Sequence, residues 1–133
     1  MSIVKLIDLP SLEDNRGALV SIEAAKNIPF EVKRVYYIYG TKKGVSRGFH
    51  AHKNLQQLAV CVSGSCRMLL DNGKSREEIW LNTPEVGLII GNSIWREMHD
   101  FSEDCVLLVL ASEHYDESDY IRDYSVFIKQ ATQ

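Results

Sequence analysis

The stretch RGFHAHKNLQQ, which runs from Arg47 to Gln57, carries two histidines separated by a single residue. Side chains two positions apart on a β-strand point to the same side, so His50 and His52 would present two imidazoles together on one face. If this face lines the interior of a barrel, the pair forms a functional site. The alternative is a pair of surface histidines on an edge strand. The sequence on both sides of the stretch bears on this choice.

Strand-like runs separated by turn residues fill most of the chain around the histidines. They cover residues 3–6, 18–22, 33–39, 48–52, 55–62, 65–70, 75–81, 86–90, 94–98 and 105–110. Asp71-Asn72-Gly73 lies between two runs, and Asn-Gly favours a tight hairpin turn. The apolar runs 86–91 and 105–111 are typical of strands covered on both faces. Helix is predicted only at the C-terminus, over about 119–130 with Asp119 as the N-cap, so the fold class is all-β.

The 133 residues are 45% hydrophobic and 25% charged, and we expect residues 1–133 to form one domain whose strand-rich body spans about 3–112. A net charge of −3 argues against a nucleic-acid surface, because phosphate binding needs excess Lys and Arg. No apolar run suits a membrane span and no secretion signal is evident, which predicts a cytoplasmic protein. Cys61, Cys66 and Cys105 are expected to be reduced core residues, while a reactive thiol would need a basic neighbour.

The pattern around the histidine pair resembles the first motif of the cupin family. This motif contains, in order, a glycine, His50, His52, a position that is usually Glu, and a later glycine. Gln57 occupies the Glu position here. The segment from Gly87 to Arg96 resembles the second cupin motif. The resemblance covers roughly residues 30–112 and implies a cupin, which is an RmlC-like jelly roll.

Two departures from the cupin pattern concern metal binding. Metal-binding cupins use three histidines and a carboxylate, whereas this chain has Gln57 at the Glu position and Arg96 at the last His position. Neutral Gln is a poor ligand for a transition metal, and a permanent cation in the site would repel one. Glu97 or His99 could supply ligands, but on a strand they share a face with each other and not with Arg96. We therefore expect no metal.

Longer motifs in chain order resemble one family of enzymes. They are KRVYYI at 33–38, RGFHAHK at 47–53, VGL at 86–88, WREMHDF at 95–101, VLASE at 109–113 and YDESDYIR at 115–122. Together they resemble the dTDP-4-oxo-6-deoxyglucose 3,4-ketoisomerases, the FdtA/QdtA type of the WxcM-like cupins. The similarity extends from Arg16 to Arg122 and implies an isomerase without a cofactor that acts on a dTDP-linked 4-keto-6-deoxyhexose.

The implied reaction moves a ketone from C4 to C3 of the sugar through an enediolate. Histidine suits such proton transfers because its ordinary pKa, about 6.5, is close to neutral pH. We assign the carbon proton to His50 and the transfer between O3 and O4 to His52, with reversed roles as the alternative. Arginine can stabilise the enediolate and bind the diphosphate. The residues expected to bind substrate are Arg16, Tyr37, Arg47, Gln57, Trp95 and Arg96, although surface arginines and core aromatics are the alternative interpretation.

The resemblance also implies a homodimer, in which edge strands of the N-terminal segment are covered. It implies a step toward dTDP-3-amino-3,6-dideoxyhexoses for cell-surface polysaccharide such as the O-antigen of lipopolysaccharide. The configuration at C4 of the product, galacto or gluco, stays open. Three other functions also stay open: a metal-dependent cupin dioxygenase or isomerase, a non-catalytic sugar-binding cupin, and a dTDP-sugar 3,5-epimerase.

Overall fold

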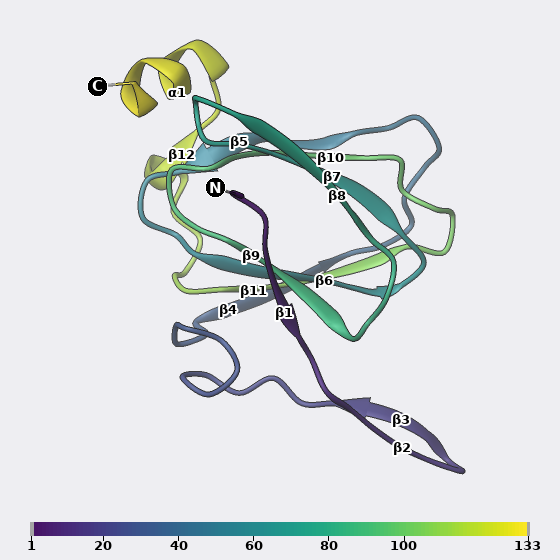
Figure 1. The fold of residues 1–133 in the computed structure, drawn as a ribbon. Coiled ribbons are helices and arrows are strands. Elements are labelled where there is room, and N and C mark those ends of the chain that lie inside the picture. Colours follow the sequence, from purple (N-terminus) through teal and green to yellow (C-terminus); the bar gives the residue numbers. More distant parts are fainter. Residues whose placement is uncertain (1, 133) are drawn as a thin grey trace.

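Two antiparallel sheets face each other across the core in the computed structural model, which describes residues 2–132 (Figure 1). The first, called the β6 sheet, has the order β1 (Lys5–Asp8), β9 (Val86–Ile90), β6 (Gln57–Ser63), β11 (Val106–Ala111) and β4 (Arg34–Ile38). The second, called the β5 sheet, has the order β12 (Tyr120–Ile121), β5 (Arg47–His52), β10 (Trp95–His99), β7 (Cys66–Asp71) and β8 (Arg76–Leu81). The predicted all-β jelly-roll architecture is confirmed.

Alternation along β6 shows how the strands divide their side chains between two apolar layers. Ala59 and Cys61 point into the core between the sheets, whereas Leu58 and Val60 point to the opposite face. That face is covered by the segment 9–30, which supplies three buried apolar residues, Leu9, Ile28 and Phe30. Burial on both faces explains why these strands are apolar throughout, as the sequence predicted for 86–91 and 105–111.

The C-terminal helix α1 (Tyr124–Ala131) is shorter than predicted and covers the outer face of the β5 sheet (Figure 1). It begins after Asp123, whose side chain accepts hydrogen bonds from two backbone N–H groups of the first turn. The predicted N-cap Asp119 was wrong, because it ends the short 3₁₀ helix η1 (Glu117–Asp119) and is followed by β12. The apolar stripe of α1 packs through Phe127 against Trp95.

A two-stranded hairpin, formed by β2 (Ser11–Asp14) and β3 (Gly17–Val20), projects from the body (Figure 1). The sequence predicted β3 and missed β2. The hairpin predicted between β7 and β8 is confirmed, and Gly73 in its loop has a positive φ of 92°. No helix within residues 2–132 is long and apolar enough to cross a membrane.

A bulge interrupts the pairing of β5 with β10 next to the histidines. Arg96 pairs with His50 and Glu97 pairs with Gly48, so Phe49 has no partner on β10. Gly48 has φ of 93°, and a Cβ there would lie 3.1 Å from the backbone oxygen of Arg96. Phe49 also has a positive φ of 58°, which is uncommon for a bulky residue. Such strained backbone concentrates at functional sites.

Candidate active site

His50 and His52 lie side by side on the core-facing side of β5. Their ring centroids are 4.9 Å apart and the rings are nearly perpendicular, at 88°. His52 is only 1% exposed, whereas His50 is half-buried and lines a cavity of about 500 Å³. The two-residue spacing therefore brings both imidazoles to the same side of β5, with His50 lining the cavity and His52 packed behind it.

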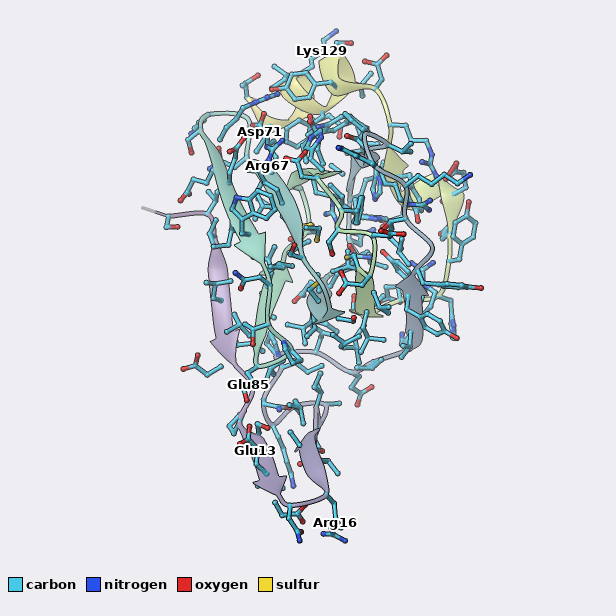
Figure 2. All side chains as sticks on the ribbon, turned by 90° about the vertical axis from the view of Figure 1, so that its right-hand side faces the viewer. Glu13, Arg16, Arg67, Asp71, Glu85 and Lys129 are labelled. Atoms are coloured by element: carbon cyan, nitrogen blue, oxygen red, sulfur yellow. The ribbon has the colours of Figure 1, made fainter. Side chains whose placement is uncertain are left out.

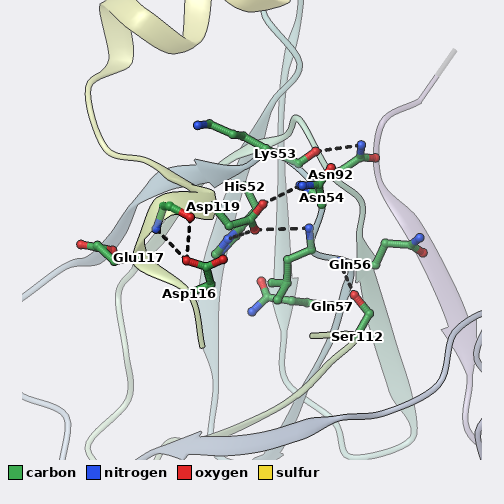
Figure 3. A network of polar contacts seen from close by, with 12 residues as sticks. His52, Lys53, Asn54, Gln56, Gln57, Asn92, Ser112, Asp116, Glu117 and Asp119 are labelled. Carbon is green, nitrogen blue, oxygen red and sulfur yellow. Dashed lines mark hydrogen bonds and ion pairs between the residues drawn. The ribbon is translucent and has the colours of Figure 1, made fainter. Parts of the chain in front are cut away.

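Asp119 fixes the orientation of the His52 ring (Figure 3). Its Oδ2 accepts a hydrogen bond from His52 Nδ1 at 3.1 Å, and its Oδ1 accepts one from the backbone N–H of Asn54 at 2.8 Å. A carboxylate only accepts, so Nδ1 carries the proton and Nε2 keeps its lone pair. That Nε2 is buried and has no hydrogen-bond partner within residues 2–132. His52 thus holds a buried, unpaired basic nitrogen.

The ring of His50 is held in the same tautomer by the bulge. Its Nδ1 lies 3.1 Å from the carbonyl oxygen of Gly48, which can only accept a hydrogen bond. In the neutral ring the lone pair is therefore on Nε2. The ring of Tyr120 packs against both imidazoles, with centroid separations of 4.9 Å to His50 and 4.3 Å to His52.

Burial and a neighbouring cation keep both imidazoles neutral. Desolvation and, to a smaller extent, the charge of Arg96 together lower the pKa of His50 to about 4. The same two causes, together with the neighbouring His50, lower the pKa of His52 to about 3. At neutral pH each ring can accept a proton without first losing one.

Arg96 is a fully buried cation in the floor of the site. It is 0% exposed and donates from Nη1 to Gln57 Oε1 at 2.5 Å and from Nη2 to the carbonyl of Ile94 at 3.0 Å. Gln57 in turn donates to the hydroxyl of Tyr36 at 3.0 Å. Burial lowers the pKa of Arg96 to about 10, so the group stays charged at neutral pH. No carboxylate of residues 2–132 forms an ion pair with it. Its positive charge is therefore not neutralised by a neighbouring carboxylate and acts on the histidine pair.

These residues do not fit the metal centre of metal-binding cupins. The one neutral oxygen ligand, Gln57 Oε1, is bonded to the guanidinium of Arg96, and that cation faces the histidine pair. Glu97 and His99 contact each other at 2.9 Å on the opposite side of β10, where His99 also contacts Ser46. They cannot complete a ligand set with the two histidines.

Two residues expected to bind substrate lie elsewhere. Tyr37 is 62% exposed on the outer side of β4, and its neighbour Tyr36 points into the cavity instead. Trp95 is 3% exposed and packs under α1 against Tyr124 and Phe127. It lies on the face of β10 opposite Arg96, because adjacent residues of a strand alternate. Within one copy of the chain, neither Tyr37 nor Trp95 lines the histidine cavity.

Arg16 lies at the tip of the β2–β3 hairpin, away from the body that holds the histidines (Figure 2). Its guanidinium pairs with Asp14 at 2.5 Å, and its side chain is 86% exposed. Within one copy of the chain, Arg16 therefore does not reach the cavity.

The mouth of the cavity is cationic and aromatic. Phe49 and Arg47 line it, Arg47 as expected, and the sequence reasoning missed Arg34, Tyr115 and Arg122, which also line it. Arg34 is the most informative, because its Nε is buried and has no hydrogen-bond partner within residues 2–132. A buried donor without a partner points to an anionic ligand. The motif YDESDYIR contains Tyr115, Asp119 and Arg122, but Asp119 was interpreted as a helix cap.

A larger cavity of about 1100 Å³ lies beside β1 and β9. It is lined by apolar and amide side chains with Lys5 and Lys26 as its charged groups, and it contains no histidine or carboxylate. It offers no pair for acid–base chemistry, so the histidine cavity is the candidate active site.

Comparison with known proteins agrees with this geometry. The family model FdtA, described as WxcM-like, C-terminal, matches residues 2–132. The chain is 58% identical over 125 residues to a TDP-4-oxo-6-deoxy-alpha-D-glucose-3,4-oxoisomerase of Aneurinibacillus thermoaerophilus, which covers 94% of this chain and 90% of that protein.

Two solved structures share the fold. A 3,4-ketoisomerase from Helicobacter canadensis is 46% identical with a TM-score of 0.96, and the match covers 100% of both chains. A mutant of the 3,4-ketoisomerase QdtA from Thermoanaerobacterium thermosaccharolyticum, in complex with TDP-4-keto-6-deoxyglucose, is 48% identical with a TM-score of 0.96 over 99% of this chain and 96% of that one. This chain therefore belongs to the WxcM-like, C-terminal family and is an isomerase, a sugar 3,4-ketoisomerase.

Proposed function

We propose that the chain converts dTDP-4-keto-6-deoxy-D-glucose into a dTDP-3-keto-6-deoxyhexose by acid–base catalysis without a metal. The observation that carries this proposal is the pair of neutral imidazoles, each with its Nε2 unprotonated, beside the buried cation Arg96. The names of the relatives support the same substrate. The reaction exchanges a ketone and a hydroxyl group within one molecule, so it needs no external oxidant or reductant.

The first step breaks the C3–H bond of the sugar. The ketone at C4 acidifies this proton, and His50 Nε2 accepts it as the electron pair moves to form an enediolate. His50 is suited to this role because its ring borders the cavity, while His52 lies deeper. His52 then transfers the proton of O3 to O4, and protonated His50 returns a proton, which solvent can exchange, to C4 and leaves the ketone at C3.

Arg96 stabilises the negative charge of the enediolate. Its guanidinium is fixed by Gln57 and by the carbonyl of Ile94, so little reorganisation is needed when the charge develops. At the mouth, Arg34 and Arg47 bind the diphosphate of the nucleotide. Neither of them forms an ion pair within residues 2–132, which leaves both charges for the ligand.

The low pKa values of the histidines predict an unusual pH profile. Between pH 8 and pH 5 the value of kcat/KM should stay constant, because both rings remain unprotonated down to about pH 4. A histidine with the ordinary pKa would lose activity roughly thirtyfold by pH 5. Initial rates at low substrate concentration, with circular dichroism as a check that the protein stays folded, measure the profile. An inflection near the ordinary histidine pKa would contradict the environment described here.

Arg96→His should change the configuration at C4 of the product more than it changes substrate affinity. The buried guanidinium constrains the hexose above the two histidines, and a shorter, titratable ring would let the sugar tilt and receive its proton on the other face. NMR of the product gives the ratio of galacto to gluco configurations, and KM gives the affinity. An unchanged configuration would remove Arg96 from control of the stereochemistry.

We further propose that the protein is a homodimer in which each β2–β3 hairpin contacts the other copy. The hairpin projects from the body and exposes Leu12 and Leu19, which are paired across its strands, so an apolar surface is left for a partner to cover. In this dimer the β2–β3 hairpin of one copy binds to the second copy and places Arg16 in the partner's active site.

Complementation tests this arrangement. Neither Arg16→Ala nor His50→Asn alone should be active, but mixed dimers should regain activity, because one site then combines His50 of one chain with Arg16 of the other. If Arg16 acts within its own chain, or not at all in catalysis, mixing will restore nothing. A monomeric mass at micromolar concentration would exclude the dimer directly.

The pathway and the compartment are also proposals. Unpaired cysteines fit the reducing cytoplasm, and the product would feed dTDP-3-amino-3,6-dideoxyhexose synthesis for cell-surface polysaccharide. The whole chain is proposed to act as one domain. Exchange at C5 of the substrate would identify a 3,5-epimerase instead.

A further inference from the structure

The three cysteines of the chain meet at one point inside the barrel, away from the histidines. Cys61 lies toward the end of β6, Cys66 opens β7, and Cys105 immediately precedes β11. Their three sulfur atoms all lie within 4.8 Å of one another, and the sulfurs of Cys61 and Cys105 are 3.6 Å apart. All are buried free thiols. Gln57 of the histidine site is at the opposite end of β6.

The spacing of the sulfurs suits a metal ion bound by three thiolates. With metal–sulfur bonds of about 2.3 Å, a cation at the centre of three sulfurs separates them by about 4 Å. One separation is 3.6 Å and none exceeds 4.8 Å, so small side-chain shifts would bring all three sulfurs to this spacing. We propose that Cys61, Cys66 and Cys105 form a binding site for one soft, thiophilic cation.

The donor set decides the class of cation. Three sulfur ligands without nitrogen or oxygen select soft ions over hard ones such as Mg²⁺. Zinc at a structural site takes a fourth ligand. The nearby carboxylate of Asp104 accepts a hydrogen bond from Ser102 Oγ at 2.7 Å, outside the three-sulfur set. The site therefore favours an ion that accepts three-coordinate sulfur, such as Cu⁺ or Cd²⁺.

The end of the barrel that holds the cysteines is closed by two loops. The turn between β6 and β7 packs closely on the segment before Cys105, because a Cβ at Gly64 would clash with Ser102 and Asp104. Glu103 and Asp104 in that segment are exposed, so two carboxyl groups attract a cation to it. Binding needs no oxidation: each thiol releases its proton to water as its sulfur bonds to the cation.

Cadmium is a suitable probe because it is soft and redox-inert. The full-length, metal-stripped protein is titrated with Cd²⁺ without oxygen, and the sulfur-to-cadmium charge-transfer absorption is followed in the ultraviolet. We expect saturation at one ion per chain, a rise in the melting temperature, and no response to Mg²⁺. Because the chain has only three cysteines, the absorption reports this cluster alone.

Cys61→Ser, Cys66→Ser and Cys105→Ser should each weaken Cd²⁺ binding roughly 100-fold or more, because each removes a direct ligand. Removing a group that only hydrogen-bonds to a ligand weakens binding less. His114→Asn, at an exposed position, is the matched control and should bind as the wild type does. If a serine variant fails to fold, the wild-type protein is tested instead. Bound Cd²⁺ should protect its thiols from alkylation, which mass spectrometry measures. Absence of charge-transfer absorption in folded protein, equal binding by the serine variants, or unprotected thiols would overturn the proposal.

Discussion

His50→Asn is expected to fold and to lose roughly 10²–10⁴-fold in kcat, which is the range for removing a general acid or base. The substitution removes the Nε2 lone pair that accepts the C3 proton in the proposed reaction. Asparagine can still donate a hydrogen bond toward the carbonyl of Gly48, so the bulge that shapes β5 should persist. The loss should therefore fall on chemistry rather than on the fold.

Deuterium exchange in heavy water shows which step of the reaction His50→Asn affects. When dTDP-4-keto-6-deoxyglucose is incubated with this variant, deuterium should not enter C3, because the carbon proton is never removed. His114→Asn should exchange and turn over like the wild type, since that side chain is exposed. Normal C3 exchange in His50→Asn would show that another group is the carbon base.

His52→Asn should lose turnover by a similar factor, roughly 10²–10⁴-fold, but for a different reason. With His50 intact, the enediolate can still form and return to substrate, so C3 should exchange with solvent while the ketone stays at C4. Asp119→Asn should show the same split in weaker form, because Asp119 acts through the tautomer of His52 rather than on substrate.

The two variants are read together. NMR of recovered substrate gives the deuterium content at C3, and NMR of the product gives turnover. Loss of both exchange and turnover in His52→Asn, with exchange preserved in His50→Asn, would reverse the assigned roles. Equal loss of exchange in both would mean that the two rings act as one unit.

The parts of the site that the sequence predicted are those set by strand alternation. His50 and His52 share a face because they are two residues apart, and Glu97 with His99 lie opposite Arg96 for the same reason. The same rule would have placed Trp95 outside once Arg96 was inside. It could not choose between Tyr36 and Tyr37, because β4 carries large side chains on both faces.

The missed parts depend on contacts far apart in the chain. Asp119 resembles a helix cap locally, yet its carboxylate bonds His52, which is 67 residues away in sequence. Arg34 belongs to β4 of the other sheet, so it lines the cavity only once the two sheets pack against each other. Arg16 was expected in the site from the resemblance and from its place before the turn glycine Gly17, but the hairpin that carries it projects from the body (Figure 1).

The most direct test of the account is NMR of the product that the purified wild-type protein forms from dTDP-4-keto-6-deoxyglucose in heavy water. The account predicts a ketone at C3, deuterium on C4 delivered through a solvent-exchanged acid, and an unlabelled C5. A ketone that stays at C4 with deuterium at C5, or substrate recovered unchanged after incubation with folded protein, would contradict it.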